Sequence, residues 1–207
     1  MRRLMLLVGI TGLTGWTDAV EWNDLDVLQI NREAPHATMM VYPDVDAAGS
    51  CDRSASPWFR SLNGDWQFNW VRSPKDRPVG FYKPQFDAGG WNTIRVPSNW
   101  QMEGYGLRIY NNMQYPFKKD PPHAPTEWNP VGSYRREFEV PGNWSGRETR
   151  IVFDGVDSAF YLWVNGKKVG YSQDSRTPAE FDITDFVRRG ENLLAVEVYR
   201  YSDGSYL

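Results

Sequence analysis

Cysteine and histidine are scarce in this 207-residue chain, which contains one Cys and two His. Because Cys51 is alone, no intrachain disulfide framework can form. His36 and His123 stand isolated, without the spacing of a zinc-ligand set. A glycine-rich phosphate loop and a nucleophile elbow are missing as well. The sequence therefore predicts no metal site and excludes disulfide-stapled and phosphate-loop proteins.

An excess of positive charge is also absent. The chain has 23 Lys and Arg against 26 Asp and Glu, for a net charge of -3, and its basic residues are scattered. Nucleic-acid binding leaves a clustered basic footprint, so we expect no nucleic-acid partner. Aromatic residues make up 15% of the chain. That is enough large apolar surface to fill a core, which argues against a disordered protein.

Long apolar runs are absent except near the N-terminus, where residues 4–13 follow two arginines. This run is too short to span a bilayer as a helix, so no membrane association is expected. Small residues at Thr17 and Ala19 fit the -3 and -1 positions of a cleavage site and predict a signal peptide over residues 1–19. A mis-assigned start and a plain amphipathic leader are the alternatives. A working signal would place the protein in the periplasm or outside the cell, and otherwise it is cytoplasmic.

Residues 20–57 show no sustained hydrophobic period and are interrupted by Pro35, Pro43, Gly49 and Ser50. This pattern is typical of an extended arm rather than a packed domain. Such an arm either wraps its own domain or reaches a neighbouring subunit.

From residue 58 onward the apolar residues recur with a period of two. Trp66, Phe68 and Trp70 alternate with polar residues, which is typical of a half-buried strand, and Asn165-Gly166 is a strong signal for a type I′ hairpin turn. Further alternating runs lie at residues 134–140, 151–153, 160–164, 169–171 and 194–198. Strands at this spacing predict an all-β fold, a β-sandwich over residues 58–207. The only helical hint is a short turn at residues 184–188.

Trp, Tyr, Asn and Gln are concentrated in residues 96–106 (VPSNWQMEGYG) and 109–117 (IYNNMQYPF). A loop of this composition suits a sugar, because an aromatic ring covers the C–H face while amides bond the hydroxyls. The alternative is that Trp100 and Tyr115 merely complete a core, since aromatic residues are common there.

Nearly the whole chain beyond the first twenty residues resembles the N-terminal region of the β-galactosidases of glycoside hydrolase family 2. The resemblance includes the two segments above and extends, in order, over residues 29–33 (QINRE), 60–68 (RSLNGDWQF), 121–127 (PPHAPTE), 153–160 (FDGVDSAF), 170–176 (GYSQDSR) and 201–207 (YSDGSYL). No single piece is as specific as a zinc-ligand quartet, but together, in this order, the pieces are a strong signal.

The resemblance implies a jelly-roll sandwich, an arm that contributes to homo-oligomer assembly, and a β-galactoside substrate. It places both catalytic glutamates in a separate barrel domain beyond Leu207, so the chain looks like a fragment that is inactive alone and works with the remaining domains of the same enzyme. It also implies magnesium and sodium for the full-length enzyme, with no cofactor held by this chain. At the position of Asn112, the family has an asparagine that hydrogen-bonds galactose. From the residues alone, both Asn112 and its neighbour Asn111 fit an ordinary turn tolerating positive φ.

Glycoside hydrolysis needs two carboxylates across the scissile bond, and no pair of acids stands out here. The pairs Asp154/Asp157 and Asp182/Asp185 fit strand ends and turns, as does Asp203. We therefore name no catalytic residue in this chain. The other readings are a family 2 β-glucuronidase or β-mannosidase, and a non-catalytic carbohydrate-binding module acting by itself.

Overall fold

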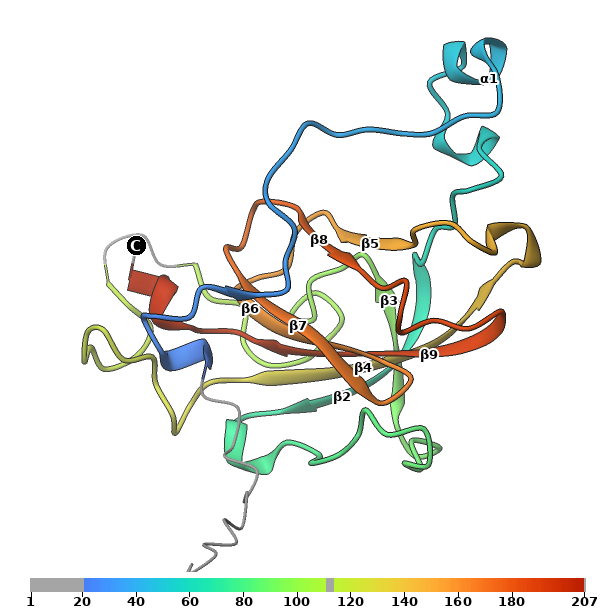
Figure 1. Ribbon diagram of the computed structural model, residues 1–207. Coiled ribbons are helices and arrows are strands. Elements are labelled where there is room, and N and C mark those ends of the chain that lie inside the picture. Colours follow the sequence, from blue (N-terminus) through green and yellow to red (C-terminus); the bar gives the residue numbers. More distant parts are fainter. Residues whose placement is uncertain (1–20, 111–113, 207) are drawn as a thin grey trace, which may run out of the picture.

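The computed structural model describes residues 21–110 and 114–206, and within them the chain is almost entirely β-structure (Figure 1). The nine strands are β1 (Gln29–Ile30), β2 (Gly64–Val71), β3 (Asn92–Val96), β4 (Val131–Val140), β5 (Arg150–Phe153), β6 (Ala159–Val164), β7 (Lys167–Gln173), β8 (Ala179–Asp182) and β9 (Gly190–Tyr199). The α-helix α1 is Val45–Gly49, and short 3-10 turns lie at Glu21–Asn23, Arg53–Ala55, Pro74–Asp76, Gly142–Trp144 and Asp203–Tyr206. None of the helices in the described ranges is long and apolar enough to cross a membrane.

Seven strands form one antiparallel sheet in the order β1-β7-β6-β9-β4-β2-β3, and β5 pairs with β8 in a second, two-stranded sheet. The space between the two sheets is filled by side chains that alternate along the strands, such as Phe160, Leu162 and Val164 of β6. The all-β jelly-roll sandwich predicted from the sequence is confirmed.

A second apolar cluster covers the other face of the large sheet. The intervening residues of β6, such as Tyr161 and Trp163, pack there with Phe81 and Trp22. The ring of Trp22 stacks on Tyr199 of β9 with centroids 5.1 Å apart. Because both faces are covered, β6 is buried along its whole length, unlike a strand with one solvated face.

The strand and turn predictions from sequence are largely reproduced. Trp66 and Phe68 are buried between the layers, and Trp70 packs against the same cluster. Asn165 and Gly166 both have positive φ, 52° and 84°, as a type I′ turn requires. The short turn predicted at residues 184–188 is present at residues 184–186, where Phe186 N–H donates to Ile183 O.

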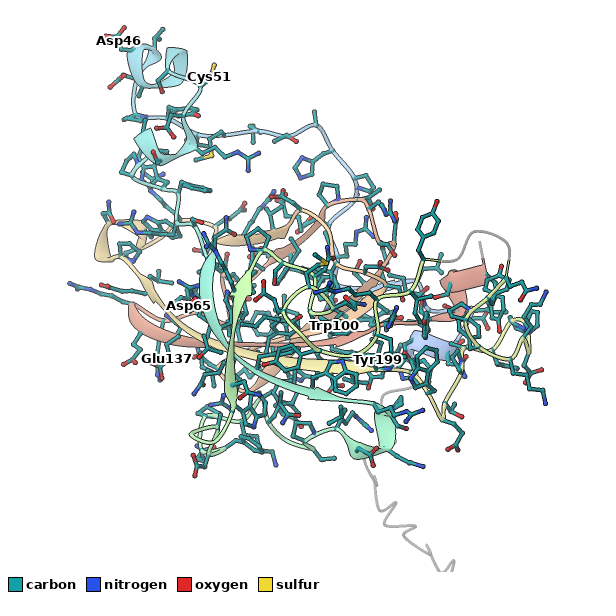
Figure 2. The ribbon with its side chains drawn as sticks, turned by 180° about the vertical axis from the view of Figure 1, so that it is seen from behind. Asp46, Cys51, Asp65, Trp100, Glu137 and Tyr199 are labelled. Atoms are coloured by element: carbon teal, nitrogen blue, oxygen red, sulfur yellow. The ribbon has the colours of Figure 1, made fainter. Side chains whose placement is uncertain are left out.

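The segment predicted as an arm divides into two parts. Residues 21–33 lie on the sandwich, where β1 adds an edge strand to β7 and Glu33 N–H donates to Glu180 O at 2.8 Å. The following residues leave the sheets and carry α1 away from them (Figures 1 and 2). Asp44 caps α1 by accepting a hydrogen bond from Ala47 N–H at 2.8 Å. The predicted signal peptide, residues 1–19, lies outside the described residues.

His36 holds the arm against β8 close to where it departs. Its Nδ1 lies 2.8 Å from Ala37 O, and its Nε2 lies 3.1 Å from Glu180 Oε2. Both ring nitrogens therefore face an oxygen acceptor, which only the imidazolium can satisfy. Glu180 also pairs with Arg150 at 3.3 Å, and Arg150 pairs with Glu148 at 3.1 Å. The hydrogen bond to Ala37 O and the charge of Glu180 raise the pKa of His36 above its ordinary value.

We expect this contact to depend on pH. A raised pKa in the folded state stabilises the docked arm fully below the ordinary His pKa of about 6.5, and this stabilisation is lost as pH rises through the folded-state value. An NMR titration of His36 in wild-type and Glu180→Gln protein measures the effect. The pKa of His36 should fall in the variant. Equal pKa values in the two proteins would show that Glu180 does not hold the imidazolium.

Candidate functional site

The connection between β3 and β4 carries most of the residues that the sequence marked for sugar recognition. Near its start, Trp100 is a buried anchor, 6% exposed, with its ring 6.3 Å from that of Phe68 on β2. The indole lies directly over Gly132 of β4, where a Cβ would come within 2.5 Å of the ring. The residue at position 132 must therefore lack a side chain. For Trp100, the alternative of a core residue is correct.

The segment after Trp100 folds back on this anchor. Tyr105 N–H donates to Trp100 O at 2.9 Å, and the Tyr105 ring meets Phe68 edge-on at 4.8 Å. Gly106 follows with a φ of +72°, a conformation that favours glycine, and packs against Trp70, whose ring a Cβ would approach to 3.1 Å. The loop is thus fixed to β2 before it turns outward, by two ring contacts with Phe68 and by the packing of Gly106 on Trp70.

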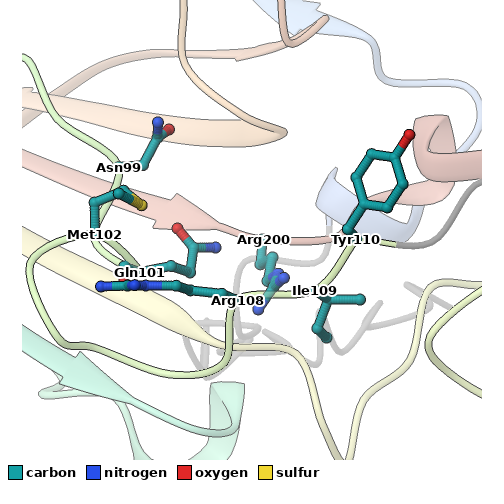
Figure 3. Close-up of a pocket in the computed structure, with 7 residues that line it drawn as sticks. All are labelled: Asn99, Gln101, Met102, Arg108, Ile109, Tyr110 and Arg200. Carbon is teal, nitrogen blue, oxygen red and sulfur yellow. The ribbon is translucent and has the colours of Figure 1, made fainter.

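An open groove of about 270 Å³ lies on the outer side of this loop (Figure 3). Its lining residues come from the loop and from the residue that follows β9: Asn99, Gln101, Met102, Arg108, Ile109, Tyr110 and Arg200. The loop is held in shape across the groove, because Arg108 Nε donates to Gln101 O at 3.1 Å. Amide and guanidinium donors thus stand beside apolar side chains, an arrangement suited to a polar ligand with an apolar face.

Tyr110 is 94% exposed and projects away from the sheets (Figure 3). The predicted sugar-binding residue Asn112 and its neighbour Asn111 lie outside the described residues. Tyr115, on the far side of that gap, is 37% exposed and packs against Phe117 and Tyr206, with ring centroids 5.6 and 5.0 Å away. Tyr115 therefore belongs to an aromatic cluster that still reaches the surface.

One acid of each pair considered for catalysis, and Asp203, has a local structural partner. Asp182 caps the following turn by accepting hydrogen bonds from the Thr184 hydroxyl and, at 2.8 Å, from Thr184 N–H. The bond from the hydroxyl, and then the bond from the N–H, lower the pKa of Asp182. Asp157 accepts from the Ser175 hydroxyl at 2.9 Å. Asp203 is buried, and one of its oxygens accepts from Gly204 N–H at 2.8 Å. These contacts give none of the three a catalytic role.

No group of three or more His, Cys, Asp or Glu side chains is arranged to hold a metal within residues 21–110 and 114–206. The second carboxylate oxygen of Asp203 is buried there without a hydrogen-bond partner. A single such oxygen falls short of the several oxygen ligands that a hard cation takes. We therefore assign no metal ligand and route no chemical step through a metal.

The sequence did not identify Arg200 or Arg108 as lining residues. A charged residue at a strand end or in a loop is usually solvated, and neither position differs in pattern from the other scattered arginines. Only the approach of the β9 end to the β3–β4 connection brings Arg200 to the groove.

Two substitutions in the loop should distinguish a residue that packs in the core from one that is exposed. Trp100→Ala should lower the free energy of unfolding of the 207-residue chain by about 3–5 kcal/mol, because a buried indole is lost and a cavity remains. Tyr110→Ala, in the same loop but exposed, should change it by less than about 0.5 kcal/mol. Denaturant unfolding of both variants is the measurement. Equal losses in the two variants would contradict the assignment of Trp100 as the anchor.

Comparison with known proteins agrees with this architecture. The family model described as "Glycosyl hydrolases family 2, sugar binding domain" matches residues 59–207. A β-galactosidase of Priestia megaterium is 46% identical over 192 residues, covering 90% of this chain and 19% of the relative. A β-galactosidase of Psychromonas ingrahamii is 44% identical over 189 residues, covering 91% of this chain and 18% of the relative. The chain thus spans about a fifth of the length of these relatives.

Solved structures share the fold at lower identity. A glycosyl hydrolase family 2 member from Bacteroides cellulosilyticus aligns with a TM-score of 0.51 and 27% identity, over 69% of this chain and 18% of the other. A β-glucuronidase of Bacteroides uniformis aligns with a TM-score of 0.51 and 24% identity, over 68% of this chain and 14% of the other. The family match covers well over half of the chain, which therefore belongs to glycosyl hydrolase family 2 and contains its sugar-binding domain.

Proposed function

We propose that this chain is the non-catalytic sugar-binding domain of a β-galactosidase that hydrolyses terminal non-reducing β-D-galactose residues in β-D-galactosides. The observation that carries the proposal is the identity of 46% and 44%, over about nine tenths of the chain, to two proteins named β-galactosidase. The amide-rich loop beside the groove supports it, because it offers paired donors and acceptors for hydroxyl groups.

In this proposal the chemistry lies outside the chain. A pair of carboxylates supplied by the rest of the polypeptide performs retaining hydrolysis, at a separation of about 5–5.5 Å. The domain contributes binding and orientation of the sugar ring through Asn112. A buried polar group left unmatched costs about 1–3 kcal/mol, so a carboxamide facing the hydroxyls discriminates between sugars although it moves no proton. The 207-residue chain alone should hydrolyse no galactoside.

The remaining expectations from sequence stay part of the proposal. They are export directed by residues 1–19, homo-oligomer assembly aided by the arm, and magnesium and sodium held by the rest of the enzyme.

A β-glucuronidase is the second candidate, because Arg108 and Arg200 both line the groove. A uronic acid carries a carboxylate that guanidinium groups pair with well, whereas galactose carries none. Both arginines already donate to backbone carbonyls, of Gln101 and Leu107 respectively. We therefore favour the galactosidase, with these guanidinium groups serving the loop.

Assay of the full-length polypeptide with aryl β-galactoside, β-glucuronide and β-mannoside tests the proposal. Turnover of the galactoside above the other two is the expected result. Activity confined to the glucuronide or the mannoside would overturn the galactosidase assignment while leaving the family assignment intact.

Asn112→Ala in the full-length enzyme should weaken galactoside binding without unfolding the protein. A lost hydrogen bond to a neutral group is worth about 0.5–1.5 kcal/mol, and more if it tightens in the transition state. The expected fall in kcat/KM is therefore about three-fold to well over ten-fold. Asn111→Ala is the matched control and should leave the kinetics unchanged. Wild-type kinetics in both variants would show that Asn112 does not bind the sugar.

A further inference from the structure

One short segment contacts the part of the β3–β4 connection that carries Asn112, residues 107–115, here called the substrate loop, at Leu107 and at Tyr115. Residues 200–206 follow β9 and end in the 3-10 turn Asp203–Tyr206. Arg200 donates from a terminal guanidinium nitrogen to Leu107 O, which precedes Asn112 in the chain, at 3.3 Å. The carbonyl of Tyr206 accepts a hydrogen bond from the Tyr115 hydroxyl, which follows Asn112, at 3.3 Å.

Arg200 is set in place by its own surroundings. Its backbone N–H donates to Pro130 O at 3.0 Å. Its guanidinium carbon lies 5.3 Å from the ring centroid of Tyr201 and 5.9 Å from that of Trp128. A planar guanidinium stacks on such rings and keeps its N–H groups directed outward. These contacts orient the side chain toward Leu107.

Tyr206 fixes the other side through contacts of its ring and of its hydroxyl. Its ring lies 5.0 Å from that of Tyr115 and edge-on to Phe117 at 5.8 Å. Its hydroxyl donates to His123 O and accepts from Asp120 N–H, both at 3.1 Å. The stretch from residue 115 to residue 123 is thereby held to the turn.

The segment itself is tied to the sandwich. The buried side chain of Asn129 bonds both backbone groups of Tyr201, donating to its carbonyl at 2.8 Å and accepting from its N–H at 2.9 Å. Ser205 closes the turn by accepting from Ser202 N–H at 3.0 Å and by donating from its own N–H to Ser202 O at 2.9 Å. A segment anchored in this way can impose its position on the loop.

We infer that residues 200–206 form a clamp that positions the substrate loop from both sides, with Arg200 and Tyr206 as positioning residues. The inference rests on the proposed function, because the clamp affects catalysis only if the loop binds sugar. A loop held at Leu107 and Tyr115 loses less conformational entropy when it binds a ligand. Loosening the clamp should therefore raise KM more than it lowers kcat. Arg200 lines the groove, but in the clamp its guanidinium holds Leu107 rather than contacting the sugar.

The test uses the full-length enzyme and an aryl β-galactoside. Arg200→Met keeps an unbranched side chain but removes the donor, and Tyr115→Phe removes only the hydroxyl that reaches Tyr206 O. Each should raise KM about three- to ten-fold with a smaller change in kcat, and deuterium uptake should increase in peptides covering residues 107–115. Arg95→Met, an exposed arginine on β3, is the matched control and should retain wild-type values.

Combining Arg200→Met with Asn112→Ala distinguishes a positioning role of Arg200 from direct contact between Arg200 and the sugar. If Arg200 acts through the loop, Arg200→Met should add little to the loss already caused by Asn112→Ala. A full multiplicative loss in the double variant would make Arg200 a direct sugar ligand and overturn the inference. The inference would also be overturned if Arg200→Met and Tyr115→Phe both left KM and deuterium uptake unchanged while Asn112→Ala still lowered kcat/KM. Wild-type kinetics in Asn112→Ala itself would instead count against the proposed function. If Arg200→Met does not fold, Tyr115→Phe decides the outcome by itself.

Discussion

The packing of the Trp100 indole over Gly132 is the contact on which the arrangement of the site depends. Any side chain at position 132 would collide with this ring, and the same ring lies against Phe68 in the main core. Tyr105 and Gly106 then pack on the aromatic side chains of β2. The loop therefore begins from a fixed base. Its outer part can present polar groups without losing its position on the sheet, as binding by a pre-organised site requires.

In the proposed function, this arrangement lets a domain that supplies no catalytic acid affect specificity. The sandwich buries one face of its large sheet under β5 and β8 and the other under N-terminal residues such as Trp22. The connection between β3 and β4 is left to form the groove at the end of β9. In the proposed function the barrel supplies the carboxylates and this domain supplies the hydroxyl contacts. The arginines of the groove act mainly on the loop backbone.

Structural features that depend on a local sequence pattern were predicted well. The alternation of Trp66, Phe68 and Trp70 and the turn at Asn165-Gly166 were recognisable because strand period and turn geometry are short-range properties. Features that depend on contacts between distant segments could not be recognised from the sequence. The burial of Trp100 requires Gly132, and the place of Arg200 requires two connections to meet. The loop that carries Asn112 was found by its composition and its family resemblance, and the position of Asn112 itself lies outside the described residues.

A crystal structure of the full-length polypeptide with a bound galactose-type inhibitor tests the proposed role of the loop most directly. We predict that the Asn112 carboxamide lies about 2.7–3.2 Å from the sugar hydroxyls. We also predict that Trp100 still covers Gly132 and that Arg200 still bonds Leu107 O. An inhibitor bound between the catalytic carboxylates with no residue of the β3–β4 connection in contact with it would contradict this role.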